Sequence, residues 1–380
     1  MDETLVAVGD RIRSLMPSGM SQRRLAGQAG MKPDALSRAL NGQRGFSSTE
    51  LARIAEELGA DLYWLATGNE DPRRVQIAAR HSWDPERRVS SNPGRSHDDA
   101  ILAQVIEVYN AAFPEGPPAS EPLPDEPARM RGVLGDDFVQ TFGAVVEARL
   151  GVDVVRLPGL TTDYSLSIGS RAVVLLATTP SWFRSNWSLA HELAHLALGH
   201  HSGIAEPAEQ DEAPANSFAA ELLLPRELVE REDWQRMDER RLAGFLWRTG
   251  VSALALKTRL DWLRITPAPS ITAAMKETTP KLIRAHAEVA GGTEKVAVRQ
   301  QGSSSRVFPS AVLDALQRRV DAGRVSPEYL AWALDVPVDE IDFPVPDDEQ
   351  VADAYARRLE DRPSAADLGK WVAANNRLAG

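Results

Sequence analysis

Apolar residues recur at helical spacing through the first seventy residues of the chain. In residues 4–16, Leu5, Val8, Ile12 and Leu15 follow one another at intervals of three or four, as on one face of an α-helix. Four shorter segments continue this pattern, with Ser, Asp, Pro or Gly at their ends: residues 21–30, 33–40, 49–58 and 61–66. The pattern predicts an all-α domain over residues 1–70, with a tight turn between its second and third helices.

The periodicity weakens between residues 71 and 130. Residues 71–98 mix charged residues with Pro, Ser and Gly, whereas residues 98–113 place apolar side chains along one helical stripe. The segment PEGPPASEPLPDEP follows, and its prolines favour an extended chain that cannot build a core. We expect residues 71–130 to be a linker with one amphipathic helix and a proline-rich tether, which keeps the flanking units mechanically separate.

Helical and strand patterns alternate over residues 131–268. Residues 131–150 favour a helix, and three short runs predict strands: 152–157, 165–168 and 172–177. The last two runs flank Gly169-Ser170 and suggest a hairpin. We expect a small antiparallel sheet beside a helix that contains residues 188–198. An edge strand of such a sheet could pair with an extended substrate chain.

Residues 269–380 have a mostly helical pattern, apart from a strand predicted within residues 291–305. No ligand cluster, glycine-rich phosphate loop or nucleophile motif occurs there, so the role of this region stays open. The fold class expected for the whole chain is mainly α with a small antiparallel β-sheet, that is, α+β. The expected units are 1–70, the linker 71–130, 131–268 and the C-terminal region 269–380.

The composition of the chain limits the cellular environments and the classes of binding partner that are compatible with it. The chain has no cysteine, which excludes disulfides and thiolate metal ligands. No apolar run approaches the ~18 residues that a membrane span needs, and no secretion signal opens the chain. We therefore expect a cytoplasmic protein with no membrane partner. The net charge of −11 argues against a protein that coats nucleic acid, so any DNA contact must come from a local patch.

The most specific chemical pattern is SLAHELAHLAL at residues 188–198. On a helix, His191 and His195 lie one turn apart on the same face, so two neutral imidazoles can bind one metal ion. Glu192 stands directly after the first histidine, and apolar residues between the histidines allow the helix to be buried. The H-E-x-x-H arrangement is typical of zinc-dependent peptidases in which the glutamate is the general base.

Two histidines leave such a metal short of one protein ligand, and the sequence offers two candidates. His201 follows His195 by six residues, as in the metzincin pattern, but that pattern requires glycine where this chain has Leu198. Glu221 lies in the apolar segment ANSFAAELLLP, where a carboxylate is costly to bury unless a metal or another partner satisfies it. We favour Glu221.

The motifs SLAHELAHLALGH and ANSFAAELLLP together resemble the ImmA/IrrE family of zinc metallopeptidases. The resemblance extends over about residues 131–265 and implies a minimal, gluzincin-like metallopeptidase domain. It implies Zn²⁺ as the cofactor, with His191, His195 and Glu221 as its ligands and Glu192 as the catalytic base.

Residues 5–68 resemble the Xre, or lambda-repressor-like, helix-turn-helix family in the order and spacing of their helices. The resemblance implies that the helix over residues 33–40 enters the major groove of double-stranded DNA. The candidate DNA contacts are Gln22, Lys32, Ser37, Arg38, Asn41 and Arg44. Residues 1–70 contain 8 Lys and Arg against 9 Asp and Glu, so the domain is not basic overall. We expect modest affinity for one copy and a homodimer on a palindromic site.

These features predict a regulatory zinc endopeptidase fused to a DNA-binding domain. The family resemblance suggests that the substrate is a transcriptional repressor of the Xre family, whose cleavage releases stress-response or mobile-element genes. One alternative is a DNA-binding transcriptional regulator whose zinc-peptidase fold is a sensor or a structural module. Another alternative is self-cleavage within the linker. The intact Glu192 favours the enzyme, because a purely structural zinc site needs no base.

Overall fold

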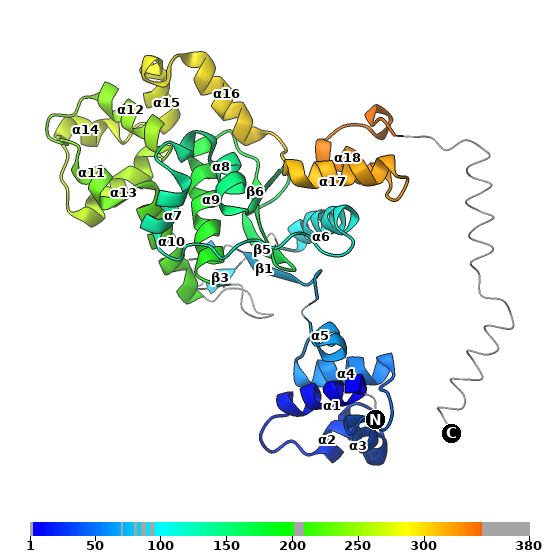
Figure 1. Ribbon diagram of the computed structural model, residues 1–380. Helices are drawn as coiled ribbons and strands as arrows, with labels where there is room; N and C mark the ends of the chain where they lie inside the picture. The colour runs from blue at the N-terminus through cyan, green and yellow to red at the C-terminus, as the bar shows by residue number, and fades with distance from the viewer. Residues whose placement is uncertain are drawn as a thin grey trace.

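The computed structural model describes residues 3–69, 71–79, 82–84, 89–91, 95–200 and 209–343. A small helical unit at the N-terminus is joined to a larger body in which helices surround one sheet (Figure 1). Buried apolar residues form three clusters, one in the N-terminal unit and one on each face of the sheet. The α+β class expected from the sequence is confirmed.

The N-terminal unit consists of the five predicted helices, α1 (Glu3–Leu15), α2 (Gln22–Gln28), α3 (Pro33–Leu40), α4 (Ser48–Leu58) and α5 (Leu62–Thr67). Polar side chains satisfy backbone N–H groups where several of these helices begin. Ser21 and Asp61 each accept a hydrogen bond from the third residue beyond them, and Ser47 forms a capping box with Glu50. Leu36 of α3 is fully buried in the centre of this unit.

A mixed four-stranded sheet forms the centre of the larger body. Its strands are β1 (Val75–Ala79), β4 (Asp153–Leu157), β5 (Tyr164–Ile168) and β6 (Arg171–Ala177), in the spatial order β1-β5-β6-β4. β5 and β6 form the predicted antiparallel hairpin, whereas β4 pairs with β6 in parallel. The expectation of a purely antiparallel sheet is therefore wrong at β4. The reason is that β4 and β6 both run opposite to β5, and the hairpin places β6 rather than β5 next to β4.

β1 comes from the segment that the sequence predicts to be a linker. It pairs antiparallel with β5, from Val75 opposite Ile168 to Ala79 opposite Tyr164. The backbone N–H of Gly169 donates to the carbonyl of Arg74 at 2.7 Å. The expected mechanical separation of the two units is wrong for this segment, because a five-residue edge strand carries too few alternations for its sequence to reveal it. β2 (Ser82–Asp84) and β3 (Val89–Ser91) form a separate two-stranded ladder.

Helices account for most of the remaining described residues. In chain order they are α6 (Arg95–Ala112), α7 (Pro127–Leu134), η1 (Phe138–Thr141), α8 (Phe142–Leu150), α9 (Trp182–Ala197), α10 (Glu209–Leu223), α11 (Arg226–Glu230), α12 (Glu239–Thr249), α13 (Ala253–Leu263), α14 (Pro269–Ala274), α15 (Thr279–Ala285), η2 (Ala287–Ala290), α16 (Thr293–Ser304), α17 (Ser310–Asp321), α18 (Pro327–Leu334) and η3 (Val338–Glu340). The helical prediction for the C-terminal region is confirmed over most of its described part. Residues 344–380 lie outside the described residues.

Two predicted elements differ from the structure. The single helix expected over residues 131–150 is divided, because Gly135 adopts φ 80° after α7 and a turn precedes η1 and α8. The strand expected within residues 291–305 is the helix α16. Val296 and Val298 would share one face of a strand, but Val296 is buried while Val298 is 66% exposed, as helical geometry requires.

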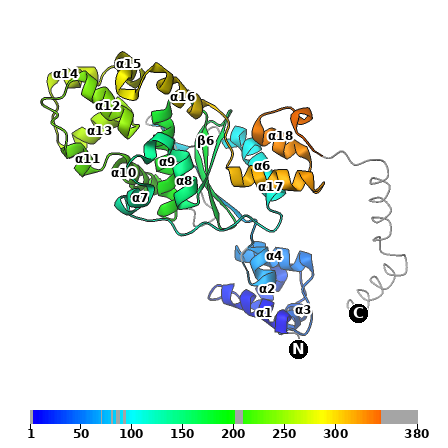
Figure 2. The same cartoon turned by 45° about the horizontal axis from the view of Figure 1, so that its top comes forward.

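Alternation along β6 supplies both faces of the sheet with apolar side chains. Val174 and Leu176 belong to the cluster that includes α8, α9 and α10, and Val173 and Leu175 belong to the cluster that includes α6, α17 and α18. Figure 2 shows α8 and α9 on one side of β6 and α6 and α17 on the other. Segments far apart in the sequence therefore share the second core.

Asp98 fastens α6 to the sheet. Its fully buried carboxylate accepts hydrogen bonds from the backbone N–H of Thr161 at 3.0 Å, from the Thr161 hydroxyl at 2.7 Å and from the Tyr164 hydroxyl at 2.7 Å. Farther along α6, the hydroxyl of Tyr109 donates to Asp153 of β4 at 2.8 Å. Burial and the nearby Asp153 carboxylate raise the pKa of Tyr109 well above its usual value, so this hydroxyl stays a donor. The amphipathic helix of the predicted linker is thus part of the core.

Replacing Asp98 should weaken the body of the protein. Asp98→Asn keeps the size of the side chain but replaces one of the two carboxylate oxygens by an amide N–H₂ group. That group cannot accept a hydrogen bond from the three donors. We expect a loss of about 1–3 kcal/mol in the free energy of unfolding, read from the midpoint of urea denaturation. Glu107→Gln on the exposed side of α6 is the matched control and should change stability by less than about 0.5 kcal/mol. Equal midpoints for Asp98→Asn and the unaltered protein would contradict this role.

Candidate metal centre

α9 carries three of the predicted site residues in its buried middle. His191, Glu192 and His195 are fully buried. The two imidazole rings lie 4.7 Å apart, as expected for residues one helical turn from each other. Their Nε2 atoms lie 3.1 Å apart. The helix therefore directs two nitrogen ligands toward one point.

α10 brings a carboxylate to the same point. Oε2 of Glu212 lies 3.4 Å from Nε2 of His191, and Oε1 of Glu212 lies 3.7 Å from Nε2 of His195. A tetrahedral zinc ion with bonds of about 2.0–2.1 Å would separate its ligand atoms by roughly 3.3 Å. The three donor groups and their spacing therefore fit a zinc ion held by two histidines and one carboxylate, with a fourth position left for another ligand.

Glu221, the third ligand favoured from the sequence, lies elsewhere. It follows Glu212 by nine residues, which on a helix is roughly 13 Å along the axis and on the opposite face. Its carboxylate forms an ion pair with the nearly buried guanidinium of Arg259 and accepts a hydrogen bond from the backbone N–H of Arg226 at 3.1 Å. The structure thus corrects the predicted ligand set by placing Glu212, not Glu221, beside the histidines.

The spacing of apolar residues along α10 indicates that Glu212 lies on the buried side of this helix. Glu212, Ala215, Ala219 and Leu222 follow one another at intervals of three, four and three residues, and the last three are fully buried. This stripe faces α9. Glu221 directly precedes Leu222 in the sequence, so it points to a different side of the helix and lies outside the stripe. The Glu221 side chain is 35% exposed rather than buried, and its charged partner is a guanidinium rather than a metal.

His200 and Asp211 extend the cluster behind His195. Nδ1 of His195 lies 2.9 Å from Nδ1 of His200, and Nε2 of His200 lies 3.8 Å from Oδ1 of Asp211. A partner on the far nitrogen fixes the orientation and tautomer of a ligand histidine, which leaves Nε2 of His195 for the metal. His201, the other candidate from the sequence, lies outside the described residues.

Glu192 points from α9 toward the sheet. Its Oε2 accepts a hydrogen bond of 2.8 Å from the hydroxyl of Ser165 on β5, and Ser165 is fully buried. β5 lies between β1 and β6 and pairs with both, so it is not an edge strand. The edges of the four-stranded sheet are β1 and β4. An extended substrate that pairs with the sheet on this side would therefore meet β1.

Four of the six predicted DNA contacts lie on α2 and α3. Gln22 opens α2, Lys32 is the N-cap residue of α3, and Arg38 stands in the last turn of α3. All three side chains are exposed, and Ser37 is half-buried. Their positions leave these side chains available to a nucleic acid.

The other two predicted contacts have partners within the N-terminal unit. Asn41 accepts a hydrogen bond of 2.6 Å from Arg13. Arg44 is half-buried and forms an ion pair with Glu50, the residue that completes the capping box of α4. Burial alone would raise the pKa of Glu50, but hydrogen bonds from Ser47 and the charge of Arg44 lower it. Arg44 therefore has a structural role that the sequence pattern does not reveal.

Comparison with known families agrees with this geometry. Residues 147–261 match a peptidase family model described as the IrrE N-terminal-like domain, and residues 7–62 match a model described as a helix-turn-helix domain. The chain combines these two domains. His191, Glu192, His195 and Glu212 all fall within the IrrE-like match, whereas β1, α6 and α14 to α18 fall outside it. No curated protein and no solved structure matches the chain significantly.

Among the described residues, no helix has both the length and the apolar character that crossing a membrane requires.

Metal content should distinguish Glu212 from Glu221. Glu212→Gln removes one of three ligands and should weaken zinc binding by more than about 100-fold, because changes outside the ligand shell already cost roughly 10–100-fold. Glu221→Gln breaks the pair with Arg259 but leaves the ligands in place, so it should retain zinc. The zinc-to-protein ratio after dialysis against a zinc buffer measures both. Zinc lost from Glu221→Gln and retained by Glu212→Gln would reverse the assignment.

Proposed function

We propose that the chain is a regulatory zinc endopeptidase that its helix-turn-helix domain brings to DNA. The observation that carries the proposal is the convergence of His191, His195 and Glu212, with the buried carboxylate of Glu192 beside them, inside the IrrE-like match. A zinc site with only a structural role has no need of a carboxylate in that position. The arrangement therefore favours catalysis over structure.

The chain's own residues supply the acid–base part of the reaction. His191, His195 and Glu212 would hold a zinc ion, which would supply Lewis acidity toward a peptide carbonyl and toward water. Glu192 acts as the general base, which accepts a proton from the attacking water and later delivers it to the leaving amine. Ser165 positions the carboxylate through its hydrogen bond to Oε2, and His200 fixes the tautomer of His195.

A cavity next to the metal centre favours a protein substrate with an apolar side chain. It has a volume of about 630 Å³ and lies between α9, α10 and α13. Trp187 and Asn216 line it, and each stands one helical turn from a metal ligand, His191 and Glu212 respectively. Trp262, 65% exposed, also lines it. A substrate chain that crosses the metal centre would therefore place a large apolar residue here.

We propose a transcriptional repressor as that substrate, with stress-response or mobile-element genes released by its cleavage. This part rests on the family resemblance and on the short connection between the two domains. Residues 68–74 alone join α5 to β1, so a chain bound to an operator keeps its metal centre close to other proteins on the same DNA. A homodimer on a palindromic site is part of the same proposal.

Changing the base should separate metal binding from cleavage. Glu192→Gln should keep its zinc and lose at least about 100-fold in cleavage rate, because an amide cannot accept the proton. The assay incubates purified full-length protein with the repressor encoded nearest to its gene, with and without a chelator, and follows intact repressor by gel electrophoresis. Glu227→Gln, on the exposed surface of α11, is the matched control and should cleave normally.

Retained proteolysis in Glu192→Gln would contradict the assignment of the base. If the unaltered, zinc-loaded protein leaves the repressor intact, the peptidase proposal fails and the regulator with a sensing or structural zinc fold replaces it.

DNA binding should depend on Arg38. Arg38→Ala removes an exposed cation from α3 and should weaken binding by about 1–3 kcal/mol if the side chain contacts a base. Fluorescence anisotropy with a duplex from the region upstream of the gene measures the change. Arg129→Ala on α7, whose side chain is 70% exposed, is the control and should bind normally. Unchanged affinity after Arg38→Ala would remove this residue from the interface.

A further inference from the structure

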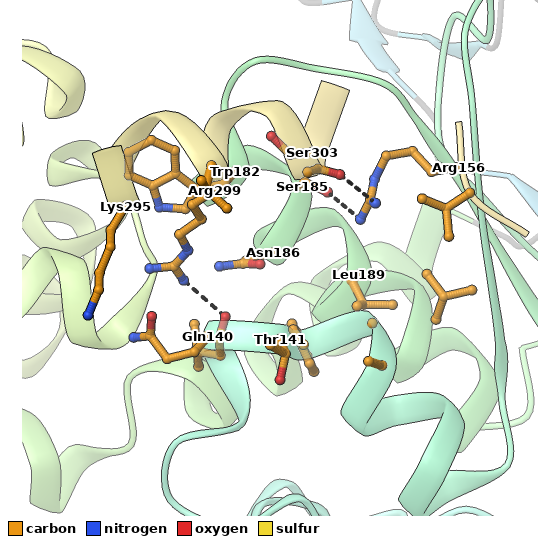
Figure 3. Close-up of a pocket in the computed structure, with 18 of the residues that line it drawn as sticks. Gln140, Thr141, Arg156, Trp182, Ser185, Asn186, Leu189, Lys295, Arg299 and Ser303 are labelled. Carbon is orange, nitrogen blue, oxygen red and sulfur yellow. Dashed lines mark hydrogen bonds between the residues drawn. The ribbon is translucent and has the colours of Figure 1, made fainter. Parts of the chain in front are cut away.

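A second cavity lies on the face of α9 that points away from the metal ligands. Trp182, Ser185, Asn186 and Leu189 of α9 line it, and at 100° per residue these positions stand opposite His191. Its other walls come from η1, α8, β4, α12 and α16 (Figure 3), and its volume is about 680 Å³. Sites for small molecules usually enclose about 300–1,000 Å³. The size therefore suits a small ligand and excludes a folded partner.

Two guanidinium groups enter this cavity from opposite walls (Figure 3). Arg299 of α16 donates hydrogen bonds of 2.9 Å to the backbone carbonyls of Trp247 and Val139. Arg156 of β4 donates to the carbonyl of Gly302 at 3.1 Å. Burial lowers the pKa of Arg299 to about 10, so it is still charged at neutral pH. Both side chains are half-buried, and within the described ranges neither guanidinium has a carboxylate within ion-pair distance.

Two donors at this cavity lack acceptors. In the part of the chain that the structure describes, Nε of Arg156 and the indole N–H of Trp182 are buried without a hydrogen-bond partner. Trp182 is only 3% exposed. Buried polar groups in native proteins are nearly always paired, so unpaired donors beside a cavity indicate an acceptor supplied from outside. An anion between the two walls would provide it.

The remaining lining limits the charge and shape of that anion. The cavity is lined by three basic residues, Arg156, Arg299 and Lys295, and by two acidic ones, Glu147 and Glu294. The Asp163 carboxylate also acts on Arg156, so a ligand with at most one negative charge fits this balance. The lining also includes large apolar side chains: Phe142, Val154, Leu189 and Trp247. The site therefore suits a molecule with one anionic group and an apolar body.

We propose that this cavity binds a small organic monocarboxylate and that it is an effector site distinct from the metal centre. The carboxylate accepts a hydrogen bond from Arg156, and the apolar body packs on the walls supplied by α8 and α12. Such a ligand contacts α9, which carries His191 and His195, and α16, which lies outside the IrrE-like match. Ligand binding can thus change the positions of His191 and His195 through α9 without any direct contact with them.

Direct binding to the full-length protein tests the proposal without reference to peptidase activity. The probes are acetate, butyrate, octanoate and phenylacetate at up to millimolar concentration, with octanamide as the uncharged counterpart and phenyl phosphate as the dianionic one. Calorimetry gives the affinity, and tryptophan fluorescence reports on the site because Trp182 and Trp247 line it. We expect octanoate or phenylacetate to bind, and octanamide to bind roughly 10- to 100-fold more weakly than octanoate.

Arg156→Gln is the deciding variant, because Arg299 also holds two backbone carbonyls and its loss can disturb the fold. Arg156→Gln should weaken carboxylate binding roughly 10- to 100-fold, and Arg156→Lys should weaken it less because the charge remains. Arg129→Gln is the matched control on the exposed surface and should bind like the unaltered protein. Circular dichroism and the unfolding temperature confirm that each variant is folded.

Three results would overturn the proposal. They are no binding of any of the four carboxylates, unchanged affinity in the folded Arg156→Gln variant, and equal affinity for octanoate and octanamide. Preference for phenyl phosphate over every carboxylate would overturn the assignment of the anion's charge. Because none of these measurements involves cleavage, their failure is distinguishable from failure of the peptidase proposal.

Discussion

The body of this protein depends on the burial of α9 between a sheet and a second helix. Two histidines and a glutamate in the middle of a helix would be costly to enclose without polar partners. The sheet supplies the Ser165 hydroxyl for Glu192, and α10 supplies Glu212 for the histidines. The cluster is therefore both the candidate metal centre and a condition for packing the helices around it. A metal ion at this point would stabilise the contact between α9 and α10 as well as serve chemistry.

The parts of the fold that the sequence predicts correctly are those with strong local signals. The N-terminal helices have a regular apolar stripe and several of them have caps, and the H-E-x-x-H motif brings two histidines together by local helical geometry alone. Pairing between distant segments has no comparable local signal. The sequence of residues 75–79 does not indicate that β1 will lie beside β5. Likewise, residues 295–299 (KVAVR) have a pattern typical of a strand, although they form a helix in which Val298 faces away from the core.

The third ligand shows where local reasoning fails. Glu212 and Glu221 belong to the same helix, and choosing between them depends on which face of that helix meets α9. That face is set by tertiary packing, although the buried stripe of Ala215, Ala219 and Leu222 records it. Arg156 and Arg299 were missed for a similar reason. They are 143 residues apart in the chain, and only the fold brings them to one cavity.

The pairing of β1 with β5 has a consequence for how the two matched domains can be treated. The segment that matches the IrrE-like domain begins at residue 147, so it omits both β1 and α6. Excised at that boundary, it would leave β5 with a bare row of backbone donors and acceptors and would uncover Tyr164, Val173 and Leu175. The recognisable domain is thus smaller than the unit that can fold. In this chain the segment from β1 to α6 is a structural component of the peptidase body, so a separation that preserves the sheet has to fall before β1, in the short connection after α5.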